Sequence, residues 1–433
     1  MSFPMYPEYK DSGVNWIGNV PKHWNIKPLK WLAEQVTEKA IASNFQVGLE
    51  NIEGWSGRFI ETEGEFSGDG IEFRPEDILF GKLRPYLAKA WLSDKAGQAV
   101  GDFFVLRPNA IHGEFLHKYI LTPTVIDNLN ASTIGAKMPR VGWEDMAALA
   151  VALPPREEQT QIARFLDHET ARIDALIEEQ QRLIELLKEK RQAVISLAVT
   201  KGLDPTVPMK DSGVEWLGEV PTHWRARKVK RLFTQSKRQG YSDMEVLSVY
   251  RDYGVIKKNS RDDNNNKTPD DLSLYQLVER GDLVVNKMKA WQGSLGVSEH
   301  SGITSPDYVV YRPHHDESPR FIHHSLRASH MPNIYLAISN GIRPSQWRIE
   351  PDKFEQLVLF LPDKVEQLEI AAYLEVQAQE MDELMQCCEQ AVELFTERRA
   401  ALISAAVTGK IDVRSWQPTA STQAPESAVA EVV

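Results

Sequence analysis

The stretch KDSGVNWIGNVPKHW, from Lys10 to Trp24, decides the fold because it occurs a second time 200 residues later. The second copy is KDSGVEWLGEVPTHW, from Lys210 to Trp224, and 11 of the 15 positions are identical. A repeat of this quality at one fixed separation indicates that the chain contains two copies of one structural unit.

The ends of the two halves also match each other. The segment LPPREEQTQIARFLD, which begins at Leu153, resembles LPDKVEQLEIAAYLE, which begins at Leu361. Further on, KRQAVISLAVT from Lys190 resembles RRAALISAAVT from Arg398. The chain is therefore a tandem duplication whose two copies begin and end alike.

The middle of each half keeps only short matching segments. DILFGKLRPY, from Asp77, aligns with DLVVNKMKAW, from Asp282, and DFFVLRP, from Asp102, aligns with DYVVYRP, from Asp307. These segments are apolar or β-branched and are bounded by Gly, Pro and Asp, which is typical of strands. The sequence between them diverges, so two copies of one scaffold are expected to carry different surfaces.

The segments that follow the two Leu-Pro motifs have the pattern of long helices. Their apolar residues recur at alternating spacings of four and three, which is typical of a coiled-coil seam. Each helix would span about 40 residues, or roughly 60 Å, which is too long for the core of one small domain, so the two helices are expected to pack on each other. Gly202 and Gly409 are expected to end them. The expected seam positions are Ile162, Leu166, Glu169, Ile173, Leu176, Gln180, Leu183, Leu187, Lys190, Val194 and Leu197, with Ile370, Leu374, Gln377, Met381, Leu384, Cys388, Ala391, Phe395, Arg398, Leu402 and Ala405.

The sequence therefore predicts an α+β protein with an internal pseudo-two-fold repeat. Two domains of mixed strands and short helices are joined by two long antiparallel coiled-coil helices. The residues after Trp416 include few large apolar side chains, so the C-terminal tail is expected to be disordered. In chain order, the predicted parts are the first domain at 1–154, the first long helix at 155–201, a linker at 202–208, the second domain at 209–361, the second long helix at 362–411 and the tail at 412–433.

Composition excludes several classes of protein. The chain has 433 residues, of which 42% are hydrophobic and 26% charged, so we expect a globular protein rather than a disordered or fibrous one. The longest uninterrupted apolar run, Met146 to Leu153, is far shorter than the roughly 20 residues of a membrane span, and the first residues lack a signal-peptide pattern. The only cysteines, Cys387 and Cys388, are neighbours and cannot staple distant elements. We therefore expect a cytoplasmic protein that does not enter the membrane.

Net charge gives only weak support for a nucleic-acid partner. The 50 basic and 61 acidic residues give −11, which on its face argues against binding a polyanion. The distribution is uneven, because residues 209–350 contain 21 basic against 17 acidic residues, or +4, whereas residues 351–433 contain 6 against 15, or −9. The motifs, rather than the bulk charge, must decide the function.

The sequence lacks the motifs of the common catalytic and cofactor sites. Gly81-Lys82 and Gly409-Lys410 are not followed by Ser or Thr, as a phosphate-binding P-loop requires. There is no Asn-Pro-Pro-aromatic run of the adenine methyltransferase type, and the 11 histidines do not have the spacing of metal ligands on a helix. We therefore expect no enzymatic activity, no cofactor and no metal in this chain.

Taken together, the pattern resembles the specificity subunit of type I restriction-modification systems. The resemblance rests on the paired KDSGV-W-G-VP-HW openings, the paired LP-EQ helix starts, the segments ILFGKLRPYLAK and VVNKMKAWQG, and the closing AAVTGKID. It covers the chain up to about Ile411. The resemblance implies that residues 1–154 and 209–361 are target-recognition domains, each reading one half of a split DNA site, and that the two long helices act as a ruler.

The resemblance also implies a set of partners. These are double-stranded DNA, two methyltransferase subunits that bind S-adenosylmethionine, and two restriction-translocase subunits that hydrolyse ATP with magnesium. The implied function is sequence-specific DNA recognition that positions the adenine methyltransferase and the nuclease-translocase, while the specificity subunit itself is not catalytic. Two alternatives stay open, namely a coiled-coil scaffold that binds only proteins and a stand-alone DNA-binding protein without restriction activity.

Two clusters in each half are candidates for DNA contact. The first has two cations and an aromatic residue at equal spacing in both halves, which strand alternation would place on one face; a solvated strand face is the alternative. The second lies in loops with Gly and Pro, where binding residues concentrate, and includes Arg and Gln, which suit guanine and adenine edges. The predicted DNA-binding residues are Lys82, Arg84, Tyr86, Lys137 and Arg140 in the first half, and Lys287, Lys289, Trp291, Gln292, Arg343, Gln346 and Arg348 in the second.

Other repeated residues are interpreted as structural. A residue that reads different DNA halves should differ between the copies, whereas four tryptophans of the opening repeat do not. Arg107 and Arg312, each before a proline at the end of a predicted strand, are also expected to serve the structure. The tryptophans predicted to pack in the core are Trp16, Trp24, Trp216 and Trp224.

Overall fold

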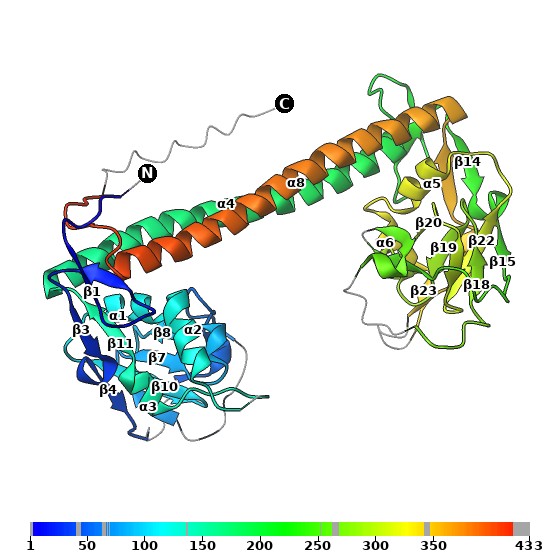
Figure 1. Ribbon diagram of the computed structural model, residues 1–433. Helices are drawn as coiled ribbons and strands as arrows, with labels where there is room; N and C mark the ends of the chain where they lie inside the picture. Colours follow the sequence, from blue (N-terminus) through cyan, green and yellow to red (C-terminus); the bar gives the residue numbers. More distant parts are fainter. Residues whose placement is uncertain are drawn as a thin grey trace. The chain divides into compact units, whose positions relative to one another are not determined.

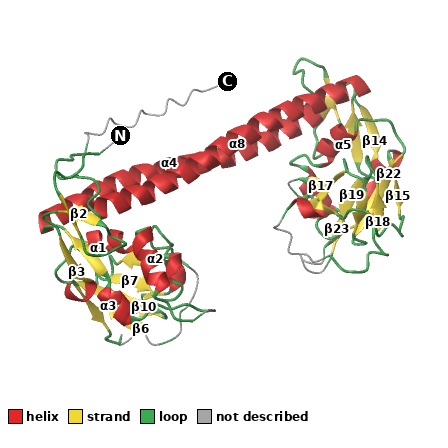
Figure 2. Ribbon diagram, in the orientation of Figure 1, coloured by secondary structure: helices red, strands yellow, loops and turns green. Residues whose placement is uncertain are grey.

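The computed structural model describes residues 3–39, 45–62, 66, 68, 70–135, 137–251, 253–261, 268–341 and 347–418. The chain forms two compact units. The first unit comprises Met1–Gln180 with Gln390–Val433, and the second comprises Gln181–Glu389. Each unit contains one sheet-rich domain and a part of each long helix (Figures 1 and 2). The expected α+β fold is confirmed.

The first domain is built on a four-stranded antiparallel sheet in the order β4-β10-β7-β8, accompanied by a three-stranded sheet in the order β5-β9-β6. Its strands are β1 (Tyr9–Asp11), β2 (Asn19–Pro21), β3 (Asn25–Pro28), β4 (Ala33–Val36), β5 (Gln46–Val47), β6 (Gly70–Phe73), β7 (Ile78–Gly81), β8 (Ala90–Leu92), β9 (Gly97–Val100), β10 (Phe103–Pro108) and β11 (Ala150–Leu153). Its helices are α1 (Gly113–Ile120), α2 (Pro123–Ala131) and α3 (Trp143–Ala148), with short 3-10 turns η1 (Leu29–Trp31), η2 (Leu49–Asn51) and η3 (Pro85–Leu87).

The second domain repeats this plan with a four-stranded sheet in the order β15-β22-β19-β20. Its strands are β12 (Met209–Asp211), β13 (Glu219–Pro221), β14 (Arg225–Lys228), β15 (Phe233–Ser236), β16 (Leu247–Tyr250), β17 (Gly254–Lys257), β18 (Gln276–Val278), β19 (Leu283–Asn286), β20 (Leu295–Val297), β21 (Gly302–Thr304), β22 (Tyr308–Pro313), β23 (Ser339–Asn340), β24 (Arg348–Ile349) and β25 (Val358–Leu361). Its helices are α5 (Pro319–Leu326), α6 (Met331–Ala337) and α7 (Pro351–Glu355), with 3-10 turns η4 (Val229–Arg231), η5 (Lys258–Ser260) and η6 (Ala290–Gln292).

Both central sheets are buried on two faces, which explains their continuous apolar strands. Successive side chains of a strand point to opposite faces, so Ile78 and Phe80 of β7 join the cluster that contains the α1 residue Phe115. Leu79 lies between them and joins a different cluster with Phe73 of β6. Residues of β19 divide in the same way between two clusters of the second domain. Each main sheet is therefore covered on one face by helices and on the other by smaller strands.

Two additional strand pairs connect the start of each domain to its end. Strand β3 pairs antiparallel with β11, with Ile26 opposite Ala152, and β14 pairs with β25, with Ala226 opposite Phe360. The opening repeat comes just before the first strand of each pair, and a long helix begins just after the second. This pairing places the His-Trp end of each opening repeat beside the start of a long helix.

The long helices are α4 (Arg156–Lys201) and α8 (Lys364–Val407), and they pack side by side in antiparallel directions. In the first unit, Arg399 Nε lies 2.8 Å from Asp174 Oδ1. In the second unit, Arg191 Nη1 lies 2.6 Å from Asp382 Oδ1. Both helices stop at the predicted glycine signals, and no helix among the described residues is long and apolar enough to cross a membrane.

The helix seam keeps many of the predicted positions but differs from the prediction at several others. Leu183 and Leu197 were expected in the seam, yet 42% and 61% of their surface is exposed. The next residues, Ile184 and Ala198, are only 9% and 3% exposed. In α8, Leu384 is likewise exposed. The prediction was wrong at these places because adjacent apolar residues fit both phases of the pattern.

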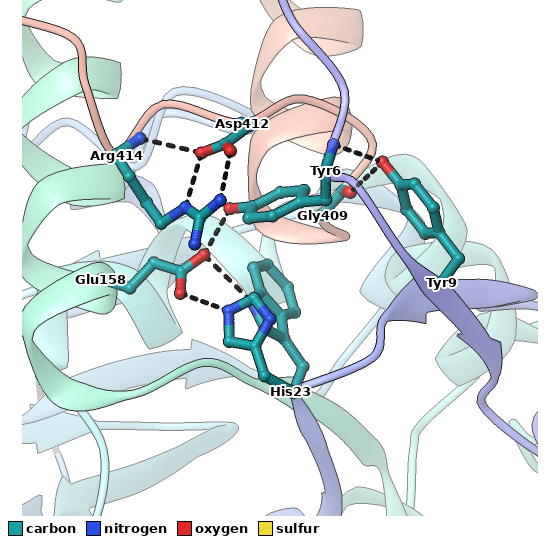
Figure 3. Close-up of polar contacts among 8 residues, drawn as sticks. Tyr6, Tyr9, His23, Glu158, Gly409, Asp412 and Arg414 are labelled. Atoms are coloured by element: carbon teal, nitrogen blue, oxygen red, sulfur yellow. Dashed lines mark hydrogen bonds and ion pairs between the residues drawn. The ribbon is translucent and has the colours of Figure 1, made fainter.

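A buried carboxylate joins the first opening repeat to the start of α4 (Figure 3). Glu158 Oε1 accepts hydrogen bonds from Trp24 Nε1 at 3.0 Å and from the Tyr6 hydroxyl, while Oε2 lies 2.8 Å from His23 Nε2. The side chain of Glu158 is only 6% exposed. Burial and the neighbouring carboxylate raise the pKa of Tyr6, so its hydroxyl remains a donor. The repeated His-Trp pair is therefore a structural attachment to the long helix.

The second unit repeats this attachment with fewer partners. Glu366 Oε1 accepts from Trp224 Nε1 at 3.1 Å, and its Oε2 lies 2.7 Å from His223 Nε2. Glu366 is 26% exposed, and position 206, which corresponds to Tyr6, is a threonine. The first unit consequently has the more buried and more heavily bonded of the two attachments.

Residues 412–418, which were assigned to a disordered tail, are part of the first unit. Val413 is fully buried, and the Trp416 ring packs edge-on against Phe165 at 5.3 Å between centroids. The Asp412 amide donates to the Pro4 carbonyl at 2.7 Å, so the two terminal segments contact each other. The predicted boundary was wrong because a few apolar side chains after the helix suffice to hold the segment; residues 419–433 lie outside the described part of the chain.

The structural interpretation of the repeated tryptophans is confirmed for the buried pair. Trp24 is fully buried and Trp224 is 1% exposed. Trp16 is partly buried against the core, whereas Trp216 is 38% exposed and stacks on the ring of His330. The second tryptophan of each opening repeat thus packs in the core, whereas the first is only partly covered.

The two arginines that precede strand-end prolines, Arg107 and Arg312, have different surroundings. Arg107 pairs through two nitrogens with the buried Asp77, at 2.9 and 2.7 Å, as expected of a structural residue. In the second domain the corresponding Asp282 accepts from Arg238 at 2.7 Å instead, and Arg312 is exposed. The ion pair with this aspartate is thus made by Arg238, from the loop after β15, rather than by Arg312.

A histidine occupies the same place in helix α1 and in helix α5, buried in the first domain and half-buried in the second, and it predicts a pH dependence. Burial lowers the pKa of His117 to about 4 and that of His323 to about 3. The unfolded chain then binds protons that the folded chain does not, so stability is lost as pH falls from about 6.5 toward 4, at about 1.4 kcal/mol per pH unit for each histidine. We expect His117→Gln to reduce this slope in pH-dependent urea unfolding of the first unit. An unchanged slope would contradict the assignment.

Candidate nucleic-acid interface

The first predicted cluster does not lie on a strand face. Strand β7 ends at Gly81 and β19 ends at Asn286, before the candidate cations begin. Arg84 has a left-handed backbone conformation with φ of 50°, and the 3-10 turn Pro85–Leu87 follows it. Proline has no amide hydrogen for a strand ladder, so the chain turns away from the sheet here. The prediction of alternation along one strand was therefore wrong, and the candidate residues lie in a loop.

Backbone hydrogen bonds bring the two predicted clusters together in both domains. The Lys82 carbonyl accepts from the Val141 amide at 3.1 Å, and the Lys287 carbonyl accepts from the Ile349 amide at 3.0 Å. In the first domain the Arg84 amide also donates to the Pro139 carbonyl at 2.7 Å. The same bond thus joins loops that are about 60 residues apart, and it places Arg140 and Arg348 in equivalent positions directly before the bonded amides.

The first domain concentrates its cations around one carboxylate. Arg140 Nη2 lies 2.9 Å from Asp102 Oδ2, and Lys82 Nζ lies 3.7 Å from Asp102 Oδ1. The Lys82 ammonium also lies over the Phe104 ring, 5.7 Å from its centroid. The remaining candidates of this domain are exposed and contribute to the same loops; they are Arg84, Tyr86 and Lys137.

The second domain arranges the corresponding residues differently. Lys287 Nζ donates to the Pro306 carbonyl at 3.0 Å. Trp291 is held by a bond from its Nε1 to the Met288 carbonyl at 3.0 Å and packs edge-on against Trp347. Arg348 Nε lies 3.1 Å from the Met288 sulfur. The candidates Arg343 and Gln346 lie outside the described residues.

A large groove in the second domain includes three of the predicted residues. The groove has a volume of about 1580 Å³, which exceeds the roughly 300 to 1,000 Å³ of small-molecule sites. Lys289, Trp291 and Gln292 line it. Lysine and glutamine donors beside an aromatic ring provide both electrostatic attraction and contacts to base edges.

Other residues of this groove were not predicted from the sequence. Tyr250, Lys258 and Tyr275 line it from elements outside the two predicted clusters. A signal was present in VLSVYRDYGVIKK, residues 246–258, where cations and aromatic rings alternate with strand residues. Burial raises the pKa of Tyr275 and of Tyr308, which also lines the groove, so both phenols remain protonated near neutral pH. The groove therefore contains hydrogen-bond donors in addition to its lysines.

Comparison with protein families identifies part of the chain directly. Residues 69–187 match the family described as the type I restriction modification DNA specificity domain. This match covers the second half of the first domain and continues into α4. It includes all five candidate residues of the first domain.

Curated relatives point to the same family. The type I restriction enzyme EcoDI specificity subunit of Escherichia coli is 23% identical over 224 residues, which cover 48% of this chain and 45% of that protein. The MjaVIII specificity subunit of Methanocaldococcus jannaschii is 31% identical over 104 residues, which cover 24% of this chain and 23% of that protein. The chain thus spans less than half the length of the curated relatives it matches.

Solved structures share the fold over most of the chain. A chain from a study of complex assembly and conformational transition in the type I restriction-modification system has a TM-score of 0.68 at 16% identity, and 90% of this chain and 98% of that chain are covered. The HsdS subunit from Thermoanaerobacter tengcongensis has a TM-score of 0.52 at 17% identity over the same shares. Residues 69–187 therefore contain a type I restriction modification DNA specificity domain, the curated relatives that the chain resembles are type I specificity subunits, and the solved structures share its fold.

Proposed function

We propose that this chain recognises double-stranded DNA and that each domain reads one half of a bipartite target. The observation that carries the proposal is the repeated loop frame, in which Lys82 and Lys287 accept the same backbone bond from a second loop. The two domains share this bond between the loops while their exposed side chains differ. Different side chains on loops joined in the same way are what two unlike half-sites require.

The chemistry of both loop pairs fits a duplex. Lysine and arginine side chains neutralise phosphates and fix the position of a protein on DNA, whereas arginine, glutamine and aromatic groups at base edges supply sequence selectivity. The first domain offers Arg84, Lys137 and Arg140 as exposed cations, and the groove of the second domain offers Lys258 and Lys289. A net charge of −11 for the whole chain is compatible with this function because the candidate cations are gathered at two loops.

The proposal includes a role in assembly. We infer that the chain positions two adenine methyltransferase subunits and two restriction-translocase subunits, which supply the S-adenosylmethionine, ATP and magnesium chemistry, while this chain supplies specificity without catalysis. Support comes from the family and from the duplicated architecture, because a pseudo-two-fold repeat offers equivalent surfaces to two copies of a partner. The cytoplasm, where such a complex meets chromosomal DNA, is the proposed location.

A selection experiment tests the function. The full-length chain, alone and with a type I methyltransferase subunit from the same organism, is incubated with a library of random duplexes, and bound DNA is sequenced. We expect enrichment of a motif with two defined parts separated by a gap of fixed length. Binding by the chain alone would favour a stand-alone DNA-binding protein, and absence of any enriched motif in both conditions would favour a protein scaffold.

The length of the helices should set the gap between the two parts. Deleting the facing heptads 184–190 of α4 and 383–389 of α8 removes about 10 Å of helix, or about three base pairs of B-DNA. We expect the selected gap to shorten by about this amount while both half-sites keep their sequences. A variant of unchanged length with Glu185→Gln and Glu389→Gln is the control. An unchanged gap in the deletion variant would contradict the ruler function.

A further inference from the structure

We propose that Asp102 is a positioning residue that holds the Arg140 guanidinium for a paired contact with two neighbouring acceptor atoms of DNA. Two groups on DNA have this chemistry, namely the O6 and N7 atoms of a guanine and two oxygens of one phosphate. The inference rests on the proposed function and deepens it, because it assigns one specificity determinant of the first half-site.

The backbone of Arg140 is fixed from two sides. Its amide donates to the Ile134 carbonyl at 3.1 Å, and the Ile134 amide donates back to the Arg140 carbonyl at 3.0 Å. A second bridge links Arg140 to Leu83, which directly follows Lys82. The backbone that carries this side chain is therefore restrained by its neighbours, although the residue lies in a loop.

The side chain of Arg140 is held at one end of its guanidinium. Nη2 lies 2.9 Å from Asp102 Oδ2, and the arginine is 52% exposed while the aspartate is 25% exposed. A guanidinium has five N–H donors in a planar fork, and the contacts within the described residues engage only Nη2. The half-exposed guanidinium therefore keeps further N–H groups that can donate two parallel hydrogen bonds to a ligand.

Asp102 holds a second cation with its other oxygen. Lys82 Nζ lies 3.7 Å from Oδ1 and over the ring of Phe104. The backbone of Asp102 is itself fixed, because its carbonyl accepts from the Lys82 amide at 2.9 Å. One carboxylate between two cations leaves a local charge of about +1, so the cluster still attracts a phosphate backbone.

The second domain has the same carboxylate without this arrangement. Asp307 is the residue of the second domain that corresponds to Asp102. Its carbonyl accepts a hydrogen bond from the Lys287 amide at 3.3 Å, as the Asp102 carbonyl does from Lys82. Its side chain is exposed, and none of the ion pairs within the described ranges includes it. Lys287 turns to the Pro306 carbonyl and Arg348 to the Met288 sulfur. Asp307 is therefore a natural control for the role of Asp102.

The ion pair has a small effect on stability and a larger one on binding. Exposed pairs contribute about 0 to 1 kcal/mol to folding, so replacing Asp102 should leave the domain folded. An arginine side chain otherwise loses much rotamer freedom when it binds, and holding it beforehand removes part of that cost. Asp102 should therefore strengthen specific binding although its charge opposes that of DNA.

A double-mutant cycle tests the proposal with the full-length chain and the duplex that the wild type selects. We expect Arg140→Ala to weaken binding about 10- to 100-fold, within the range for a contacted base. Asp102→Asn should weaken it about 3- to 10-fold, by losing the pre-arrangement of the guanidinium. The double variant should be no weaker than Arg140→Ala, because Asp102 acts through the arginine. Asp307→Asn should bind as tightly as the wild type or more tightly.

Base selectivity and salt dependence of binding distinguish contact with guanine from contact with phosphate. Contact with guanine predicts that the loss is confined to one base pair of the first half-site, whereas contact with phosphate predicts a uniform loss and a salt slope smaller by about one. Tighter binding by Asp102→Asn, or independent effects in the double variant, would overturn the proposal while leaving DNA recognition intact. A wild type that selects no motif would overturn the proposed function and this inference together. Circular dichroism of each variant verifies that it is folded.

Discussion

Replacing Glu158 by alanine is expected to destabilise the first unit by about 3 to 5 kcal/mol. The change leaves the Trp24 indole and the Tyr6 hydroxyl without their acceptor, and both groups are buried. Each buried donor without a partner costs about 1 to 3 kcal/mol. The attachment between the opening repeat and α4 should therefore open, and amide hydrogen exchange should increase in residues 3–24 and in the first turns of α4.

Two matched variants define what this result means. Glu157→Ala removes the neighbouring exposed carboxylate from the same helical turn, so it has the same effect on the helix dipole and should change stability by less than about 0.5 kcal/mol. Glu366→Ala removes the corresponding acceptor of the second unit, which is more exposed and has fewer partners, and should cost about 1 to 2 kcal/mol. Equal effects of Glu157→Ala and Glu158→Ala would show that burial of the carboxylate contributes nothing.

The repeat explains why the architecture was predictable from the sequence. The copies at Lys10 and Lys210 required two equal units, and the spacing of apolar residues after Leu153 and Leu361 required two long helices. The phase of the seam was not predictable, because Leu183 and the adjacent Ile184 are both apolar and only the packed structure chooses between them. The spacing of apolar residues therefore predicted the two helices, whereas packing decided which of two adjacent apolar side chains lies between them.

The sequence suggested residues for the two candidate loops but not how these loops are arranged. Equal spacing of cations pointed to Lys82 and Lys287, and the structure joins each of them to the second predicted loop. Nothing in the linear sequence shows that Asp102 is 2.9 Å from Arg140 while Asp307 has no such pair within the described residues, because these contacts depend on loop conformations that differ between the copies. The groove residue Tyr275 was missed for a similar reason. The residues that line the groove with it are distant in the sequence and come together only in the fold.

Replacing Gly409 by alanine is expected to destabilise the first unit by about 2 to 5 kcal/mol through two separable effects. Gly409 ends α8 with φ of +74°, which costs a residue with a side chain about 1 to 2 kcal/mol. A β-carbon here would also lie 2.3 Å from Cδ of Pro21 and 3.2 Å from the Trp24 ring, and overpacking of this kind costs about 1 to 3 kcal/mol. The Gly409 carbonyl accepts from the Tyr9 hydroxyl at 3.1 Å, so a shift of the helix end would also disturb that bond.

Gly13 separates the conformational cost from the steric one. It has nearly the same φ, +73°, but a β-carbon built on it meets no atom within 4 Å. Gly13→Ala should therefore cost only the conformational part, about 1 to 2 kcal/mol, and the difference between the two variants in hydrogen exchange of the first unit measures the contact between α8 and the opening repeat. If both variants lose the same stability, the end of α8 does not press on Pro21, and steric contact with α8 contributes nothing to holding the opening repeat. If Gly409→Ala loses more, one opening repeat holds the start of one long helix and the end of the other, which explains why its sequence recurs almost unchanged.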